Sequence, residues 1–193
     1  MKISREYKVW EASAKDDSRP ILREVLIERT EERKSATGGK FNGVAVGCDG
    51  FMMAIVPVWL DDDDVPGTVK ASVIADAVKG WPVKGMDPEI QLGEKEVSYF
   101  GKTGRVTAER SSGGTFPDYK RVVPQYRYCK EKRKGQTFAI NPKLLQRLAT
   151  ALGVTIPKFT VAKRSEPIII ETHVGQGREL MVPFGLLMPA HTY

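Results

Sequence analysis

The side chains that could carry catalysis are few and scattered. The two histidines, His173 and His191, have no neighbours that suggest a catalytic triad or a metal site. The sequence has no Gly-rich phosphate-binding loop, no Cys-x-x-Cys and no His-Glu-x-x-His motif. The two cysteines, Cys48 and Cys129, form neither a disulfide framework nor a metal-ligand spacing. We therefore expect a binding protein with no catalytic residues, no cofactor and no metal, rather than an enzyme.

One acidic run could be a cation site. Asp61, Asp62, Asp63 and Asp64 are consecutive. Consecutive carboxylates rarely converge on one ion, because their side chains diverge along the backbone. The run is therefore interpreted as a solvated, self-repelling loop.

Positive charge is the feature that points to a partner. The chain has 30 Lys and Arg against 24 Asp and Glu, for a net charge of +6, and such a balance favours polyanions such as nucleic acid. Tyr128 lies within a dense basic stretch, and a base could stack on its ring while the cations bind phosphates. The alternative is a solvated linker. The cations of this stretch are Arg127, Lys130, Lys132, Arg133 and Lys134.

Size and composition fit a globular protein. With 193 residues, 41 % hydrophobic and 28 % charged, the chain can form one large or two small domains. It has no apolar run of the roughly 18 residues that a membrane span needs, and its first ten residues lack the apolar region of a secretory signal. We expect a cytoplasmic protein.

The elements that position the binding residues are predicted to be mostly strands. Residues 40–46 and 51–59 are apolar runs separated by Asp49-Gly50, and Asp-Gly between two such runs predicts a hairpin. Before them, residues 7–12 and 21–29 are predicted strands, and residues 31–39 a loop.

A strand, a helix and about three strands then occur twice. In the first unit, residues 67–110, we expect a helix from Ser72 to Gly80 among strands at 68–71, 89–92, 96–100 and 104–110. In the second, 136–189, Asn141 and Gly153 delimit a helix among strands at 137–140, 158–162, 167–171 and 180–188. Residues 7–60 look like the same unit with its helix shortened or lost. This repetition predicts an α+β fold with antiparallel sheet on one side and helices on the other.

One segment carries a specific resemblance. Gly114-Thr115-Phe116-Pro117-Asp118-Tyr119-Lys120-Arg121-Val122-Val123-Pro124 resembles the connector between the second and third domains of the bacterial DNA polymerase III beta subunit, the sliding clamp. Further segments resemble that family in the same order and extend the resemblance over most of the chain. They are residues 19–26, 46–54, 138–145, 166–170 and 186–189.

The resemblance implies a DNA-clamp-like fold in a reduced, phage-like form. From the resemblance we expect no counterpart of the clamp's first domain, and we expect the basic stretch to replace the first half of its third domain. The expected organisation is a clamp-like domain of two repeat units at 1–123, with a reduced helix in the first. A basic linker at 124–135 and a third repeat unit at 136–193 follow.

In that family, partner proteins insert a short hydrophobic peptide between the second and third domains. Methionine suits such a pocket because it adapts to several peptides, although Phe51, Met52 and Met53 could also be strand core. The terminal strand could contribute either residues 181–184 or residues 187–189. The pocket implied by the resemblance consists of Leu22, Cys48, Gly50, Phe51, Met52, Met53, Pro124, Leu187, Met188 and Pro189.

The resemblance also implies non-specific contact with duplex DNA through basic side chains on helices. Lys143 and Arg147 are four residues apart and so share a helix face. The family's ring contains twelve repeat units, and this chain has about three. A ring would therefore require about four chains; a dimer and a monomer are the alternatives. The candidates are Arg19, Lys79, Lys84, Lys143 and Arg147, with the basic stretch beside them.

Two functions follow. The first is a processivity factor that tethers a DNA polymerase or another replication or repair protein to DNA. The second is a ring-less module that docks or sequesters clamp-binding peptides as a regulator.

Overall fold

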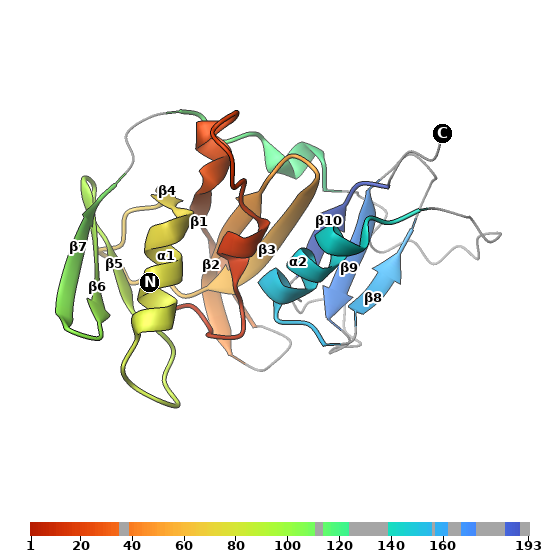
Figure 1. Cartoon of the computed structure of the whole chain (residues 1–193). Coiled ribbons are helices and arrows are strands. Elements are labelled where there is room, and N and C mark those ends of the chain that lie inside the picture. The colour runs from red at the N-terminus through yellow and green to blue at the C-terminus, as the bar shows by residue number, and fades with distance from the viewer. Residues whose placement is uncertain are drawn as a thin grey trace.

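A computed structural model describes residues 1–34, 39–110, 114–123, 139–155, 157–161, 167–172 and 184–189. Within these residues two antiparallel sheets form the body of the protein, and helices cover one face of them (Figure 1). The α+β architecture expected from the repeated units is confirmed.

The larger sheet has seven strands in the order β4-β1-β2-β3-β10-β9-β8. Strands from distant parts of the sequence meet at its centre, where β3 pairs with β10 and Phe184 lies opposite Ile55. The last part of the chain therefore extends the sheet built by the first part. The strands are β1 (Glu24–Lys34), β2 (Lys40–Cys48), β3 (Met52–Val58), β4 (Gly67–Lys70), β8 (Pro157–Thr160), β9 (Ile168–Thr172) and β10 (Phe184–Leu187).

The smaller sheet consists of β5 (Ile90–Leu92), β6 (Glu96–Gly101) and β7 (Gly104–Glu109). Strand β4 pairs with β1, and Lys2 forms isolated bridges with both Trp59 and Glu89. The N-terminal segment thereby joins the end of β3 to the start of β5.

Three helical segments lie on the same side of the sheets: η1 (Val9–Ala12), α1 (Ala71–Gly80) and α2 (Pro142–Leu152) (Figure 1). Helix α2 begins as predicted, since the side chain of Asn141 accepts a hydrogen bond of 3.0 Å from the Lys143 amide. It ends at Gly153, whose φ of 66° favours glycine. Two short 3-10 helices, η2 (Pro20–Arg23) and η3 (Tyr119–Arg121), lie elsewhere.

Alternation along the strands divides the buried side chains into two cores. The helix-side core joins the helices to one face of the sheet and includes Val9, Ile74, Leu148, Ile27, Ala54, Val56, Ile170 and Leu187. The outer core lies on the opposite face and consists of Val44, Val46, Met53, Ile55, Phe116, Tyr119, Ile169, Phe184 and Leu186.

Some local predictions were wrong. Residues 9–12 of the strand predicted at 7–12 form η1, whose Val9 and Trp10 pack in the helix-side core. The strand predicted at 21–29 starts only at Glu24, after η2, and continues to Lys34 into the predicted loop. Pairing with β2 sustains this extension, since Lys34 lies opposite Lys40. Of the strand predicted at 137–140, residues 137 and 138 lie outside the described residues.

The acidic run is not wholly solvated. Asp64 is buried, and its carboxylate accepts hydrogen bonds from the Met1 ammonium and, at 2.9 Å each, from the amides of Asp61 and Leu92. It therefore joins the N-terminal segment to β5. No cluster of three potential metal ligands occurs in the described residues, and none of the helices among them is long and apolar enough to cross a bilayer.

Candidate peptide-binding pocket

A cavity of ≈ 230 Å³ opens where three distant segments meet on the outer face of the larger sheet. The β2–β3 hairpin, residues 114–123 and the end of β10 supply most of its walls. Its volume is below the roughly 300–1,000 Å³ of sites for drug-sized ligands. The cavity is thus sized for a few side chains. It is lined by Arg19, Leu22, Cys48, Gly50, Phe51, Met52, Met53, Phe116, Pro117, Asp118, Tyr119, Val122, Pro167, Leu186 and Met188.

The hairpin turn presents three consecutive apolar side chains in three directions. The carboxylate of Asp49 accepts hydrogen bonds from the amides of Phe51 (2.9 Å) and Met52 (3.0 Å), and Gly50 has a φ of 91° that favours glycine. Beyond the turn, Met52 belongs to the helix-side core and Met53 to the outer core. Phe51 is 65 % exposed at the cavity mouth. Phe51 thus lies at the mouth of the pocket, whereas Met52 and Met53 are core residues that also line the cavity.

Residues 114–123 form the second wall and are held on β1. Phe116 and Tyr119 are buried in the outer core. The Tyr119 hydroxyl donates a 2.6 Å hydrogen bond to the carboxylate of Glu28, and the Lys120 ammonium lies 3.0 Å from the same carboxylate. Burial, reinforced by Glu28, raises the pKa of Tyr119, so its phenol keeps the proton that it donates.

The third wall comes from β10. Leu186 faces the cavity, and Met188, 43 % exposed, lies at its mouth, where its amide donates a 3.1 Å hydrogen bond to the Phe51 carbonyl. Leu187 does not line the cavity, because alternation along β10 turns it into the helix-side core. Pro189 is also absent from the lining. Of the other terminal motif considered, residues 181–184, only Phe184 is described; it is buried in the outer core and does not line the cavity.

The structure brings together most of the pocket residues expected from the sequence. Seven of them line the cavity: Leu22, Cys48, Gly50, Phe51, Met52, Met53 and Met188. Pro124 lies outside the described residues. The sequence interpretation overlooked Leu186 and most of the connector as lining residues, although the connector's motif was its clearest signal. Burial raises the pKa of the Cys48 thiol, which keeps this half-buried lining group neutral.

The expected DNA-binding side chains that the structure describes divide into three groups. Lys79, Lys84 and Lys143 are exposed. Arg19 lies at the pocket instead. Arg147 is engaged internally, since its guanidinium donates to the carbonyls of Glu11 and Ser13. The same guanidinium lies 3.1 Å from the Asp49 carboxylate, so Arg147 is unsuited to the DNA contact expected for it. Outside the described residues are Arg127, Lys130, Lys132, Arg133 and Lys134.

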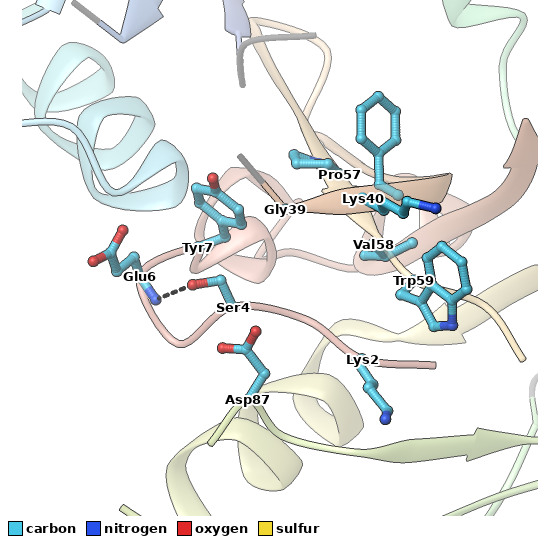
Figure 2. A pocket seen from close by; sticks show the side chains of 11 residues that line it. Lys2, Ser4, Glu6, Tyr7, Gly39, Lys40, Pro57, Val58, Trp59 and Asp87 are labelled. Carbon is cyan, nitrogen blue, oxygen red and sulfur yellow. Dashed lines mark hydrogen bonds between the residues drawn. The ribbon is translucent and has the colours of Figure 1, made fainter. Parts of the chain in front are cut away.

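A larger cavity of ≈ 740 Å³ lies beside the N-terminal segment (Figure 2). Its two lysines are committed to carboxylates: Lys2 lies 3.2 Å from Glu89 and Lys40 lies 2.8 Å from Glu32. None of the expected pocket or DNA-binding residues lines it. The smaller, apolar cavity is therefore the better candidate site.

Comparison with solved structures identifies the architecture. A sliding clamp from Pseudomonas aeruginosa superposes with a TM-score of 0.70 at 14 % identity, over 100 % of this chain and 66 % of that one. The beta sliding clamp of Caulobacter crescentus gives 0.67 at 17 % identity, over 96 % and 62 %. This chain has the fold of the bacterial sliding clamps.

A third clamp of this fold, from Bartonella birtlesii and bound to griselimycin, gives a TM-score of 0.63 at 14 % identity, over 100 % of this chain and 66 % of that clamp. The present chain thus spans slightly less than two thirds of the length of these three clamps. No family model and no curated protein matches the sequence. The clamp fold is therefore recognised through structure and through the connector motif.

Proposed function

We propose that the protein is a clamp-like processivity factor that holds replication or repair proteins on duplex DNA through the ≈ 230 Å³ pocket. The observation that carries the proposal is the convergence of the hairpin, the connector and β10 on one apolar cavity in a chain with the clamp fold. An apolar cavity of side-chain size with adaptable methionines suits a short hydrophobic peptide.

The pocket is tested by placing a charge at its mouth. Val122 lines the cavity and is 48 % exposed, so Val122→Asp should leave the fold intact. We expect this variant to bind a fluorescein-labelled peptide containing two leucines and a phenylalanine at least about tenfold more weakly, because a carboxylate would face apolar ligand groups. Val83→Asp, at a 41 % exposed position that does not line the pocket, is the matched control. Fluorescence anisotropy measures both, and equal affinity in the two variants would refute the pocket.

Contact with DNA is proposed for the face that carries η1, α1 and α2 (Figure 1). Lys79 on α1 and Lys143 on α2 are exposed there, and Lys84 follows α1. Contacts of this kind neutralise phosphates without reading sequence.

We therefore expect the affinity for duplex DNA to fall about fortyfold between roughly 50 and 200 mM salt, because each of the three lysines would contribute about −0.9 to the slope of log affinity against log salt. Changing Lys79 and Lys143 to alanine together should flatten this slope. The Lys95→Ala variant, altered in the turn between β5 and β6, should retain it. A wild-type protein that fails to bind duplex DNA at low salt would remove the DNA contact from the proposal.

The ring-less module remains a second candidate, and one observation favours it. The described residues of a single chain supply the cavity, so a peptide could dock without a ring. A ring instead requires self-association, for which β8 of the larger sheet and β7 of the smaller one, among other edge strands, each have an edge without a described strand partner. Light scattering of the protein with and without circular duplex DNA separates the two. A monomeric mass at high concentration favours the module, whereas an oligomer retained on the circle favours the processivity factor.

A further inference from the structure

The ≈ 740 Å³ cavity beside the N-terminal segment, here called the N-terminal cavity, has the features of a second site (Figure 2). Its volume is within the roughly 300–1,000 Å³ that is typical of small-molecule sites. It shares no lining residue with the peptide pocket. The two also lie at opposite ends of β2 and β3, since Lys40 begins β2 and Trp59 follows β3. A ligand of the N-terminal cavity would therefore bind independently of the peptide.

One wall of the N-terminal cavity is apolar. Pro57 and Val58 are buried there, and the aromatic side chain of Trp59 is half-buried. The backbone of this wall is fixed, because Lys2 and Trp59 exchange two backbone hydrogen bonds of 2.7 and 3.0 Å. An alkyl chain could pack against such a wall, and the face of an indole ring attracts cations.

The other wall is acidic. Glu6 and Asp87 line the cavity with exposed side chains, and neither carboxylate forms a hydrogen bond or an ion pair with a described residue. The two lysines of the lining are each paired with a carboxylate from outside it: Lys2 lies 3.2 Å from Glu89, and Lys40 has a similar partner. The described lining therefore keeps a surplus of negative charge at Glu6 and Asp87.

Tyr7 lies between these two carboxylates and the core. Its side chain is only 7 % exposed and lines the cavity, and its hydroxyl forms no hydrogen bond with a described residue. Burial, reinforced by the charges of Glu6 and Asp87, raises the pKa of this hydroxyl, so both carboxylates act on the same group. Figure 2 shows Glu6, Ser4, Tyr7 and Asp87 grouped on one side of the cavity. A buried hydroxyl oxygen without a partner can accept a hydrogen bond from a ligand.

The acidic wall is built on fixed backbone. A Cβ added at Gly153 would lie 2.6 Å from the Glu6 carbonyl oxygen, so the chain at Glu6 packs against the end of α2. The amide of Ile3 donates a 3.3 Å hydrogen bond to the carbonyl of Pro88, which holds the residue next to Asp87 against the N-terminal segment. The backbone that carries the two carboxylates is thus in place before a ligand arrives, and this lowers the entropic cost of binding.

An organic cation suits this lining better than a metal ion. The described residues contain no group of three potential metal ligands, whereas calcium takes six or more oxygen ligands. The apolar wall would cover alkyl groups instead. We propose that the N-terminal cavity binds a short aliphatic diamine, with its ammonium groups at Glu6 and Asp87 and its alkyl chain against the wall that contains Trp59. This proposal goes beyond the proposed function, because it assigns a small-molecule ligand to a second site.

The test is a titration of the wild-type protein with putrescine, a short aliphatic diamine, followed through the tryptophan indole signals in proton–nitrogen NMR spectra at low salt. We expect a saturable shift of the Trp59 signal, with little change at Trp10 and Trp81, which do not line the cavity. The neutral diol of the same length should bind at least about tenfold more weakly, because it lacks the charges that face the two carboxylates. Sodium chloride at equal ionic strength is the control for screening.

Substitutions in the acidic wall then locate the ligand. Glu6→Gln and Asp87→Asn should each weaken putrescine binding about threefold, as expected for ion pairs at exposed positions. Tyr7→Phe should weaken it by a similar factor, because the hydroxyl acceptor is lost. Glu94→Gln is the matched control, since Glu94 is an exposed carboxylate between β5 and β6 that does not line the cavity. Thermal unfolding should be unchanged in the variants of the three exposed acids.

Four outcomes would overturn the proposal. They are equal affinity for putrescine and the diol, a Trp59 shift that sodium chloride reproduces, unchanged putrescine affinity in all three cavity variants, and equally tight binding of N-acetylarginine amide. The last would show that a single positive charge suffices, which contradicts a diamine. Saturating putrescine should leave binding of the fluorescein-labelled peptide unchanged. Failure of putrescine to bind would therefore leave the peptide pocket standing, and failure of the peptide to bind would leave the diamine site standing.

Discussion

Replacing Arg147 with methionine should lower the free energy of unfolding by about 2–4 kcal/mol and weaken peptide binding at the pocket. The guanidinium joins three segments of the chain. It donates to the Glu11 carbonyl at 3.0 and 3.2 Å and to the Ser13 carbonyl at 3.2 Å, and it lies 3.1 Å from the Asp49 carboxylate. The Asp49 side chain is only 9 % exposed, so methionine would leave a poorly solvated negative charge without its partner.

The effect on the pocket follows from the turn that Asp49 organises. The same carboxylate accepts the amides of Phe51 and Met52, which fix the backbone where the hairpin meets the cavity. Arg147 thus acts on the pocket through Asp49, as a positioning residue that does not line the cavity. Loss of its charge should loosen the turn and make peptide binding severalfold weaker.

Urea unfolding and fluorescence anisotropy measure the two effects. Gln146→Met, at the exposed neighbouring position on α2, is the control and should change stability by no more than about 0.5 kcal/mol. In a double-mutant cycle, Asp49→Asn should cost less in the Arg147→Met background than in the wild type, because the unpaired charge is then removed. Additive costs would show that the two side chains are not coupled.

Arg147 also shows where sequence reasoning reaches its limit. Its spacing from Lys143 predicts a shared helix face, and that local inference led to a DNA-binding role. Its actual partners, Glu11 and Ser13, lie more than 130 positions away in the sequence. No local pattern encodes such a contact, since it depends on how α2 packs against η1.

The features that were predicted correctly are those encoded over a few residues. Asp49-Gly50 specified the hairpin because the acid caps the turn and the glycine accepts positive φ. Asn141 and Gly153 delimited α2 for similar reasons. The assignment of Leu187 to the pocket failed because the face of a short strand depends on its register. Pairing of Leu186 with Met53 sets that register, and it is a contact between distant segments.

The junction between β3 and β10 should be equally sensitive to a single added carbon. Gly185 lies at the centre of β10 and pairs with Ala54. A Cβ at this position would lie 2.8 Å from the Met53 carbonyl oxygen and 2.5 Å from Cδ1 of Leu148 on α2. The leucine could rotate away, but the carbonyl belongs to the backbone of β3 and cannot move without disturbing the strand pair.

We therefore expect Gly185→Ala to lower the free energy of unfolding by about 2–3 kcal/mol, as overpacking of a close-packed core does. Peptide affinity should fall with it, because the displaced strand carries Leu186 and Met188 to the pocket. Gly39→Ala is the matched control, since an added Cβ there meets no atom within 4 Å. Urea unfolding and anisotropy again provide the measurements.

A second substitution identifies the cause. If the clash with α2 contributes, Leu148→Ala should cost less in the Gly185→Ala background than in the wild type, by at least about 1 kcal/mol, because the shortened side chain leaves room for the new carbon. If the costs add, the Met53 carbonyl alone accounts for the loss. A Gly185→Ala protein as stable as Gly39→Ala would show that β10 does not sit this close to β3 and α2. The pairing of β3 with β10, which makes the sheet beneath the pocket continuous, would then be contradicted.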